Sequence, residues 1–238
     1  MAKIYGTESQ YLIKQDRKYR IIALYFISLL VISLGLFYII PKSTLNIILV
    51  SFTLFIGLAI YLNKKGHLFL DRSDNYYKGR KGEYAIFYEL KRLPNDYLVF
   101  QDIKIPGNES NIDFIAIGPT GIFAIEVKSH KGKITFDGQN LLINNNHFKK
   151  DILRQAMSGA LDLHEFILKK TGKDCFVYPV LVFSNNQAYM KFGLNSIKKV
   201  FVIQKTYLKK VVLGAKPILS TEDITNLKNI LLFLSQKD

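Results

Sequence analysis

Two long runs without a charged side chain constrain this chain more than any other feature. Residues 21–40 and residues 45–62 contain no Asp, Glu, Lys or Arg. A helix of about 20 apolar residues, with a rise of about 1.5 Å per residue, matches the roughly 30 Å hydrocarbon core of a bilayer. Both runs are apolar on every side rather than along one stripe, so they favour two membrane-spanning helices over a pair of helices buried in a soluble core.

The basic residues around these runs predict an orientation. Four basic residues lie between positions 14 and 20, just before the first run, six lie between positions 64 and 81, and Lys42 alone lies between the runs. The positive-inside rule then places both termini in the cytoplasm, with a short turn at residues 41–44 on the far side. We therefore predict a cell-membrane protein that contacts the lipid bilayer through two spans. Its parts are a cytoplasmic segment over residues 1–20, a transmembrane hairpin over 21–65 and a cytoplasmic domain over 66–238.

The pattern of the last part predicts an α/β domain. The single cysteine, Cys175, excludes an intramolecular disulfide framework. Helical periodicity and apolar runs alternate in the order expected for a mixed sheet flanked by helices. The expected helices cover residues 79–93, 149–170 and 220–234, and the expected strands cover 97–105, 111–117, 122–128, 134–136, 141–143, 176–183 and 200–203.

A hairpin in the middle of this domain is the most informative stretch. Residues 111–117 and 122–128 read as strands, and between them lies the turn Gly118-Pro119-Thr120-Gly121. If this turn closes the hairpin, Ile117 pairs with Ile122. The same register carries on to the far end of both strands.

That register places Asp113 opposite Glu126. Side chains alternate along a strand, so Glu126 and Lys128 project from the face that carries Asp113. Two carboxylates facing each other repel, and a bound divalent cation such as Mg²⁺ would compensate for them. The alternative is a structural ion cluster in which Lys128 neutralises the pair on an exposed face.

These residues together resemble a known family. Gly82-Glu83 near the start of a helix, Ile112-Asp113 before a Gly-Pro-x-Gly turn, and Glu126-Val127-Lys128 after it are similar to the nuclease-related domain (NERD), a branch of the PD-(D/E)XK nuclease superfamily. The resemblance covers roughly residues 78–184. It implies a restriction-endonuclease-like mixed sheet and metal-dependent cleavage of phosphodiester bonds.

The resemblance also implies a role for each residue. Asp113 and Glu126, with Glu83, would bind one or two Mg²⁺ or Mn²⁺ ions, and Lys128 would orient the attacking water or stabilise the phosphate in the transition state. Gln155 matches a glutamine that related nucleases place beside the site. Two alternatives stay open: Glu83 interacts only with the helix macrodipole, and Gln155 is an ordinary surface residue of its helix.

The net charge of +14 is compatible with a polyanionic partner. Four lysine doublets could contact a DNA or RNA backbone, or lie against anionic lipid. They are Lys149-Lys150, Lys169-Lys170, Lys198-Lys199 and Lys209-Lys210. We therefore expect a membrane-anchored, cytoplasm-facing, metal-dependent nuclease acting on DNA. The alternatives are a catalytically silent nuclease-fold module that tethers nucleic acid or a protein partner to the membrane, and a structural membrane protein.

Overall fold

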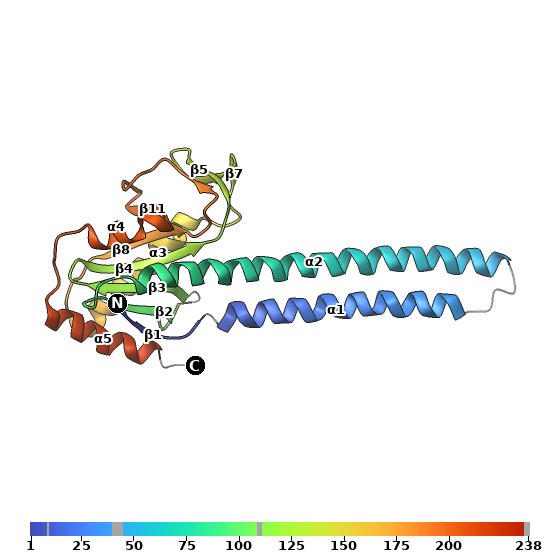
Figure 1. Cartoon of the computed structure of the whole chain (residues 1–238), viewed down its shortest axis with the longest axis horizontal. Helices are drawn as coiled ribbons and strands as arrows, with labels where there is room; N and C mark the ends of the chain where they lie inside the picture. Colours follow the sequence, from blue (N-terminus) through green and yellow to red (C-terminus); the bar gives the residue numbers. More distant parts are fainter. Residues whose placement is uncertain (9, 40–44, 109–110, 236–238) are drawn as a thin grey trace. The chain divides into compact units, whose positions relative to one another are not determined.

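The computed structural model describes residues 1–8, 10–39, 45–108 and 111–235, apart from the side chains of residues 33–34, 36–39 and 45–51. Within this range the chain divides into two compact units. The α/β unit combines Met1–Ser9 with Lys81–Asp238, and the helical unit is Gln10–Arg80. Figure 1 traces the chain from the N-terminal strand through the two long helices and back into the α/β unit.

The helical unit consists of α1 (Gln10–Ile39) and the greater part of α2 (Leu45–Lys91). The two helices pack through aromatic rings, with Tyr19 stacked on Phe69 and Tyr76 at centroid distances of 6.0 and 5.6 Å. The hydroxyl of Ser73 donates a hydrogen bond of 2.6 Å to Asp16 Oδ1. These contacts come from polar and aromatic residues outside the two charge-free runs.

The predicted membrane spans require correction. Over the residues that the structure describes, no helix combines the length and the apolar character needed to cross a bilayer. This finding contradicts the predicted two-span hairpin and the cell-membrane location with cytoplasmic termini, and it leaves the predicted contact with lipid without support. The charge-free runs are parts of longer helices: α1 already begins at Gln10 and includes Lys14 to Arg20, and α2 continues through Lys64 and Lys65 to Lys91. The predicted turn at residues 41–44 lies outside the described residues.

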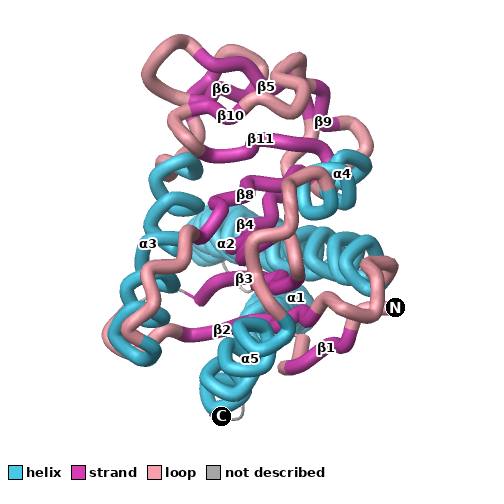
Figure 2. Tube along the Cα trace, turned by 90° about the vertical axis from the view of Figure 1, so that its left-hand side faces the viewer, coloured by secondary structure: helices cyan, strands magenta, loops and turns pink. Residues whose placement is uncertain are grey.

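The α/β unit is built on a mixed seven-stranded sheet, whose central strands lie one above another in Figure 2. The spatial order is β1 (Lys3–Tyr5), β2 (Leu98–Lys104), β3 (Asn111–Gly118), β4 (Gly121–Lys128), β8 (Val177–Phe183), β11 (Val200–Gln204) and β10 (Ser196–Ile197). Strands β2, β3 and β4 pair antiparallel, whereas β4, β8 and β11 run parallel, and β1 joins β2 as a parallel edge strand.

Helices cover both faces of this sheet. On one face Phe114 and Ile125 pack with Ile86 and Leu90 from the end of α2, and α4 (Leu208–Leu213), which follows a short 3₁₀ turn at Lys205–Tyr207, completes the layer. On the other face Ile115 and its neighbours pack against α3 (Ile152–Thr171) and α5 (Thr221–Ser235). Alternation along the strands produces these two apolar layers, so the predicted mixed sheet flanked by helices is confirmed.

A second, four-stranded sheet lies beyond β11 and β10 in Figure 2. Its order is β7 (Asn146–His147), β6 (Leu141–Ile143), β5 (Gly132–Phe136) and β9 (Ala188–Tyr189). The sequence indicated β5 and β6 but not β7 or β9, because a strand of two residues carries no readable alternation.

Candidate functional site

The predicted hairpin forms in the predicted register. Ile117 pairs with Ile122, and the backbone ladder between β3 and β4 runs from there to Phe114 and Ile125. It ends at that rung, so the predicted pairing of Asp113 with Glu126 is not part of the ladder, whereas β4 continues to pair with β8 as far as Lys128. The two strands of the hairpin therefore separate at the level of Asp113 and Glu126, and this opening is where the charged side chains gather.

Asp113 occupies the opening with its carboxylate. Its Oδ2 atom accepts a hydrogen bond of 2.7 Å from the backbone N–H of Val127, in place of a ladder bond between the strands. Burial raises the pKa of Asp113 well above its usual range, and the charges of Glu126 and Glu83 raise it further. The hydrogen bond from the Val127 N–H and the charge of Lys128 lower the pKa of Asp113.

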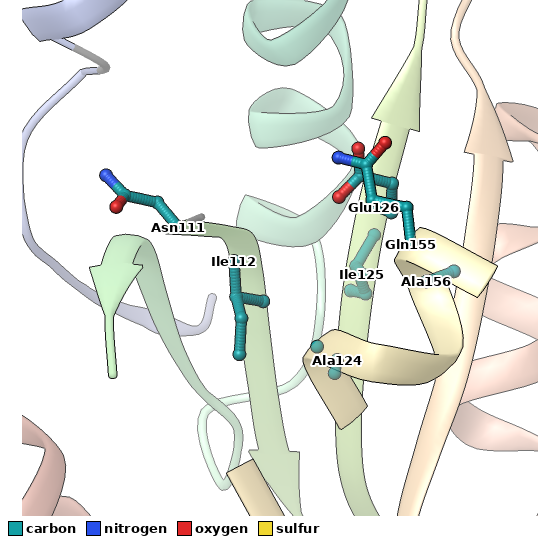
Figure 3. A pocket seen from close by; sticks show the side chains of 8 residues that line it. Asn111, Ile112, Ala124, Ile125, Glu126, Gln155 and Ala156 are labelled. Carbon is teal, nitrogen blue, oxygen red and sulfur yellow. The ribbon is translucent and has the colours of Figure 1, made fainter. Parts of the chain in front are cut away.

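Lys128 is held between two acceptors. Its Nζ atom donates to Glu126 Oε1 at 2.6 Å and to Gln155 Oε1 at 3.0 Å. Gln155 lies in the first turn of α3, whose start is fixed by Asp151 accepting a bond from Arg154 N. Figure 3 shows Gln155 pointing from α3 toward Glu126 on β4, beside a small pocket that the two residues help to line.

Glu126 is only 7% exposed. Burial therefore raises its pKa, while Lys128, a hydrogen bond from Gln155 and the charge of Lys150 lower it. The structure thus brings three of the predicted residues, Glu126, Lys128 and Gln155, into direct contact. Gln155 is not an ordinary surface residue of its helix, because its amide oxygen anchors the lysine.

Glu83 reaches the site because a glycine precedes it. A Cβ atom at Gly82 would lie 2.6 Å from Ser184 Oγ and 3.0 Å from Ser129 Cβ, so a side chain there would push α2 away from the ends of β4 and β8. Burial raises the pKa of Glu83 to about 8, and the charges of Asp102, Glu126 and Glu8 add to the effect. Because α2 begins at Leu45, Glu83 lies far from the N-terminus of its helix, and the alternative of an interaction with the positive end of the macrodipole does not apply.

Asp102 is the site residue that the sequence did not single out. It lies on β2 between the rungs Gln101–Phe114 and Ile103–Ile112, next to Asp113 on the neighbouring strand. Its φ of 54° is in the left-handed region, which costs energy for any residue but glycine. Asn111 Nδ2 donates a bond of 2.8 Å to its Oδ1 atom. The sequence did contain a signal for this residue, because Asp102 is an acidic residue within the largely apolar strand expected over residues 97–105.

The donor chemistry of the site suits a hard divalent cation. Mg²⁺ prefers oxygen ligands and takes one or two carboxylates with water rather than a complete protein cage. The charges of Glu126 and Glu83 raise the pKa of Asp113, and a cation beside it would relieve that repulsion. In the described part of the chain, however, no three His, Cys, Asp or Glu side chains are gathered so as to hold a metal ion. The ligand set Glu83, Asp113 and Glu126 therefore stays a prediction.

The raised pKa of Glu83 predicts a pH-dependent stability in metal-free buffer. The folded chain keeps this proton up to about pH 8, whereas the unfolded chain loses it near 4.5, so stability falls as the pH rises between those values. One retained proton accounts for up to about 1.4 kcal/mol per pH unit. In urea unfolding with a chelator at pH 6.5 and pH 8, we expect Glu83→Gln to lose less stability than the wild type, and Glu165→Gln on the exposed side of α3 to match the wild type. Equal losses in all three proteins would contradict the assigned environment of Glu83.

The site combines carboxylates, a lysine and a glutamine where two strands of a mixed sheet separate. In a comparison with known families, residues 78–184 match the nuclease-related domain (NERD), which suggests a nuclease-like function. The matched segment, somewhat less than half of the chain, begins near the end of α2, ends just after β8, and contains Glu83, Asp113, Glu126, Lys128 and Gln155. No curated protein and no solved structure matches the chain.

Proposed function

We propose that this protein is a metal-dependent nuclease that hydrolyses phosphodiester bonds of DNA, with a restriction-endonuclease-like core of the PD-(D/E)XK type. The observation that carries the proposal is the placement of Lys128. Its ammonium group is fixed 2.6 Å from Glu126, at the point where β3 and β4 separate beside Asp113. A fixed cation next to carboxylates suits a reaction in which negative charge develops on a phosphate.

Asp113 and Glu126, with Glu83 as a third ligand, would hold Mg²⁺ or Mn²⁺. When bound, such an ion supplies an activated water and neutralises charge on the leaving oxygen. Lys128 supplies positive charge beside the equatorial oxygens of the phosphate. The attraction between its ammonium group and these oxygens is stronger in the transition state than in the ground state. Gln155 keeps the lysine in place through its amide oxygen, so that little reorganisation accompanies the reaction.

Metal binding and cleavage are tested together on the whole chain. Linear and supercoiled DNA is incubated with the protein and Mg²⁺, Mn²⁺ or a chelator, and the products are resolved on gels. In parallel, thermal unfolding is followed with and without metal for the wild type, for Asp113→Asn, and for Asp96→Asn, which removes an equal charge from an exposed loop. A ligand at 100 times its Kd stabilises the folded state by about 2.7 kcal/mol.

We expect metal-dependent cleavage and a metal-dependent rise in melting temperature of about 5–10 °C for the wild type and Asp96→Asn. Both effects should disappear in Asp113→Asn. A rise that persists in Asp113→Asn would place the ion elsewhere, and cleavage that persists in the chelator would exclude a metal-dependent reaction.

A second candidate is a nuclease-fold module that binds nucleic acid without cleaving it. The observation that favours it is the tight Lys128–Glu126 pair, which occupies one oxygen of a predicted metal ligand. This candidate predicts DNA binding without a metal-dependent rise in melting temperature and without cleavage.

A further inference from the structure

The small sheet belongs to a basic part of the α/β unit. We define the basic lobe as residues 129–151 and 184–199, the segments that leave β4 and β8 and return to α3 and β11. The lobe contains seven lysines and two aspartates. All seven lysines are exposed: Lys131, Lys133, Lys149, Lys150, Lys191, Lys198 and Lys199.

Within the described residues, the two aspartates of the lobe form no salt bridge with its lysines. These two aspartates accept hydrogen bonds from the backbone: Asp137 accepts bonds from Gln139 N and Asn140 N, and Asp151 accepts one from Arg154 N. Among the described residues, none of the seven lysines takes part in a salt bridge. The lobe therefore presents a surface of like charge, which attracts a polyanion.

One turn of the lobe shows that lysines are held in an unfavourable conformation. Lys198 and Lys199 form the two-residue turn between β10 and β11, with φ values of 48° and 65°. Asn144 and Asn145 form the equivalent turn between β6 and β7, with 49° and 65°. Such turns favour Asn and Gly, so a pair of lysines is the strained choice, and strained positions cluster at functional sites.

The same turn is fixed to the rest of the lobe. Lys198 Nζ donates to the carbonyl oxygen of Gln139 at 2.7 Å and lies 5.9 Å from the centre of the Phe136 ring. In the part of the chain that is described, the Lys199 side chain has no hydrogen-bond or ion-pair partner. Lys198 thus anchors the turn, and Lys199 is presented to an external ligand.

The lobe is also fixed to the candidate site. Ser184 N donates to Lys128 O at 3.0 Å, Asn185 Nδ2 to Ser129 O at 3.3 Å, and Gly132 N to Gln187 O at 3.0 Å. These bonds join the two segments that enter the lobe, directly after the last residue of β4. The lysines are therefore held at a set position relative to Glu126 and Lys128, as a substrate-guiding surface requires.

We propose that the basic lobe, with its Lys198–Lys199 turn, binds the phosphate backbone of duplex DNA and leads it to the site at the end of β4. This inference rests on the proposed nuclease function, because it assigns the surface through which that site receives its substrate. Exposed lysines contact phosphates as point charges and do not read bases, so binding through the lobe is independent of sequence and sensitive to salt.

The test uses the whole chain and a fluorescent DNA duplex, with binding followed by anisotropy at several salt concentrations in a chelator, so that the DNA stays intact. The variant is Lys198→Asn with Lys199→Gly, which removes two charges while introducing the residues that this turn prefers. The matched control is Lys209→Gln with Lys210→Gln, which removes two exposed charges from α4. The melting temperature of each protein is measured alongside.

We expect the turn variant to bind about 10-fold more weakly, with a shallower salt dependence and an unchanged or higher melting temperature. The α4 control should bind like the wild type. Equal weakening in both variants would show that net charge alone matters, and unchanged binding in the turn variant would also overturn the proposal. If the wild type cleaves DNA and the turn variant binds DNA as tightly as the wild type, the proposed binding surface is refuted and the nuclease function stands. If binding depends on the turn but the wild type does not cleave DNA, the binding surface stands and the nuclease function is refuted.

Discussion

Replacing Lys128 by Met is expected to reduce metal-dependent DNA cleavage by about 10²- to 10³-fold, the usual effect of removing one group that stabilises transition-state charge. The same change should lower stability by about 3 kcal/mol, because removing one member of a buried ion pair leaves the other charge without a partner. Glu126 is that partner, and its side chain is only 9% exposed. The measurements are initial cleavage rates and urea unfolding at constant pH.

A double variant separates the two effects. Glu126→Gln combined with Lys128→Met removes both charges, so stability should return toward the wild-type value while cleavage stays lost. Lys104→Met, on the exposed side of β2, is the matched control and should change neither. Cleavage at the wild-type rate in Lys128→Met would show that the lysine has a structural role only.

Replacing Gly118 by Ala is expected to destabilise the α/β unit by about 3 kcal/mol, a typical cost of overpacking a core. A Cβ atom at this position would lie 2.3 Å from two ring carbons of Tyr97, which is 2% exposed. The ring cannot easily turn aside, because its hydroxyl is bonded to Thr120 Oγ1 at 2.7 Å and Thr120 donates to Val212 O at 2.6 Å. The melting temperature should fall by about 10 °C in thermal unfolding.

Gly159→Ala provides the control for this prediction. Its Cβ atom would lie 3.5 Å from Ile112 Cγ1, which is ordinary contact, and the position is inside α3. Alanine is favoured over glycine in a helix by up to about 1 kcal/mol, so this variant should be as stable as the wild type or slightly more so. An unchanged melting temperature in Gly118→Ala would mean that Tyr97 has room to move.

Most of the α/β unit could be predicted because its core strands alternate or are uniformly apolar over five or more residues. The hairpin register followed from Gly118 and Gly121, since a two-residue loop between them fixes the pairs of β3 and β4 as far as Phe114 and Ile125. The edge strand β1 could not be predicted, because three residues are too few to show a periodicity. Its partner, the neighbouring strand β2 from Leu98 onward, is more than 90 residues away in the chain. The predicted membrane spans were wrong, since no helix among the described residues is long and apolar enough to cross a bilayer.

By itself, the sequence determined which residues carry the charge of the site. Alternation along a strand and the register of the turn predict that Asp113, Glu126 and Lys128 share one face of the hairpin. Only the tertiary structure decided what these residues contact. Gln155 anchors Lys128, Glu83 approaches past Gly82, and Asp102 joins from the neighbouring strand. These contacts link segments distant in the chain, and their positions follow from the packing of helices against the sheet, which no local pattern encodes.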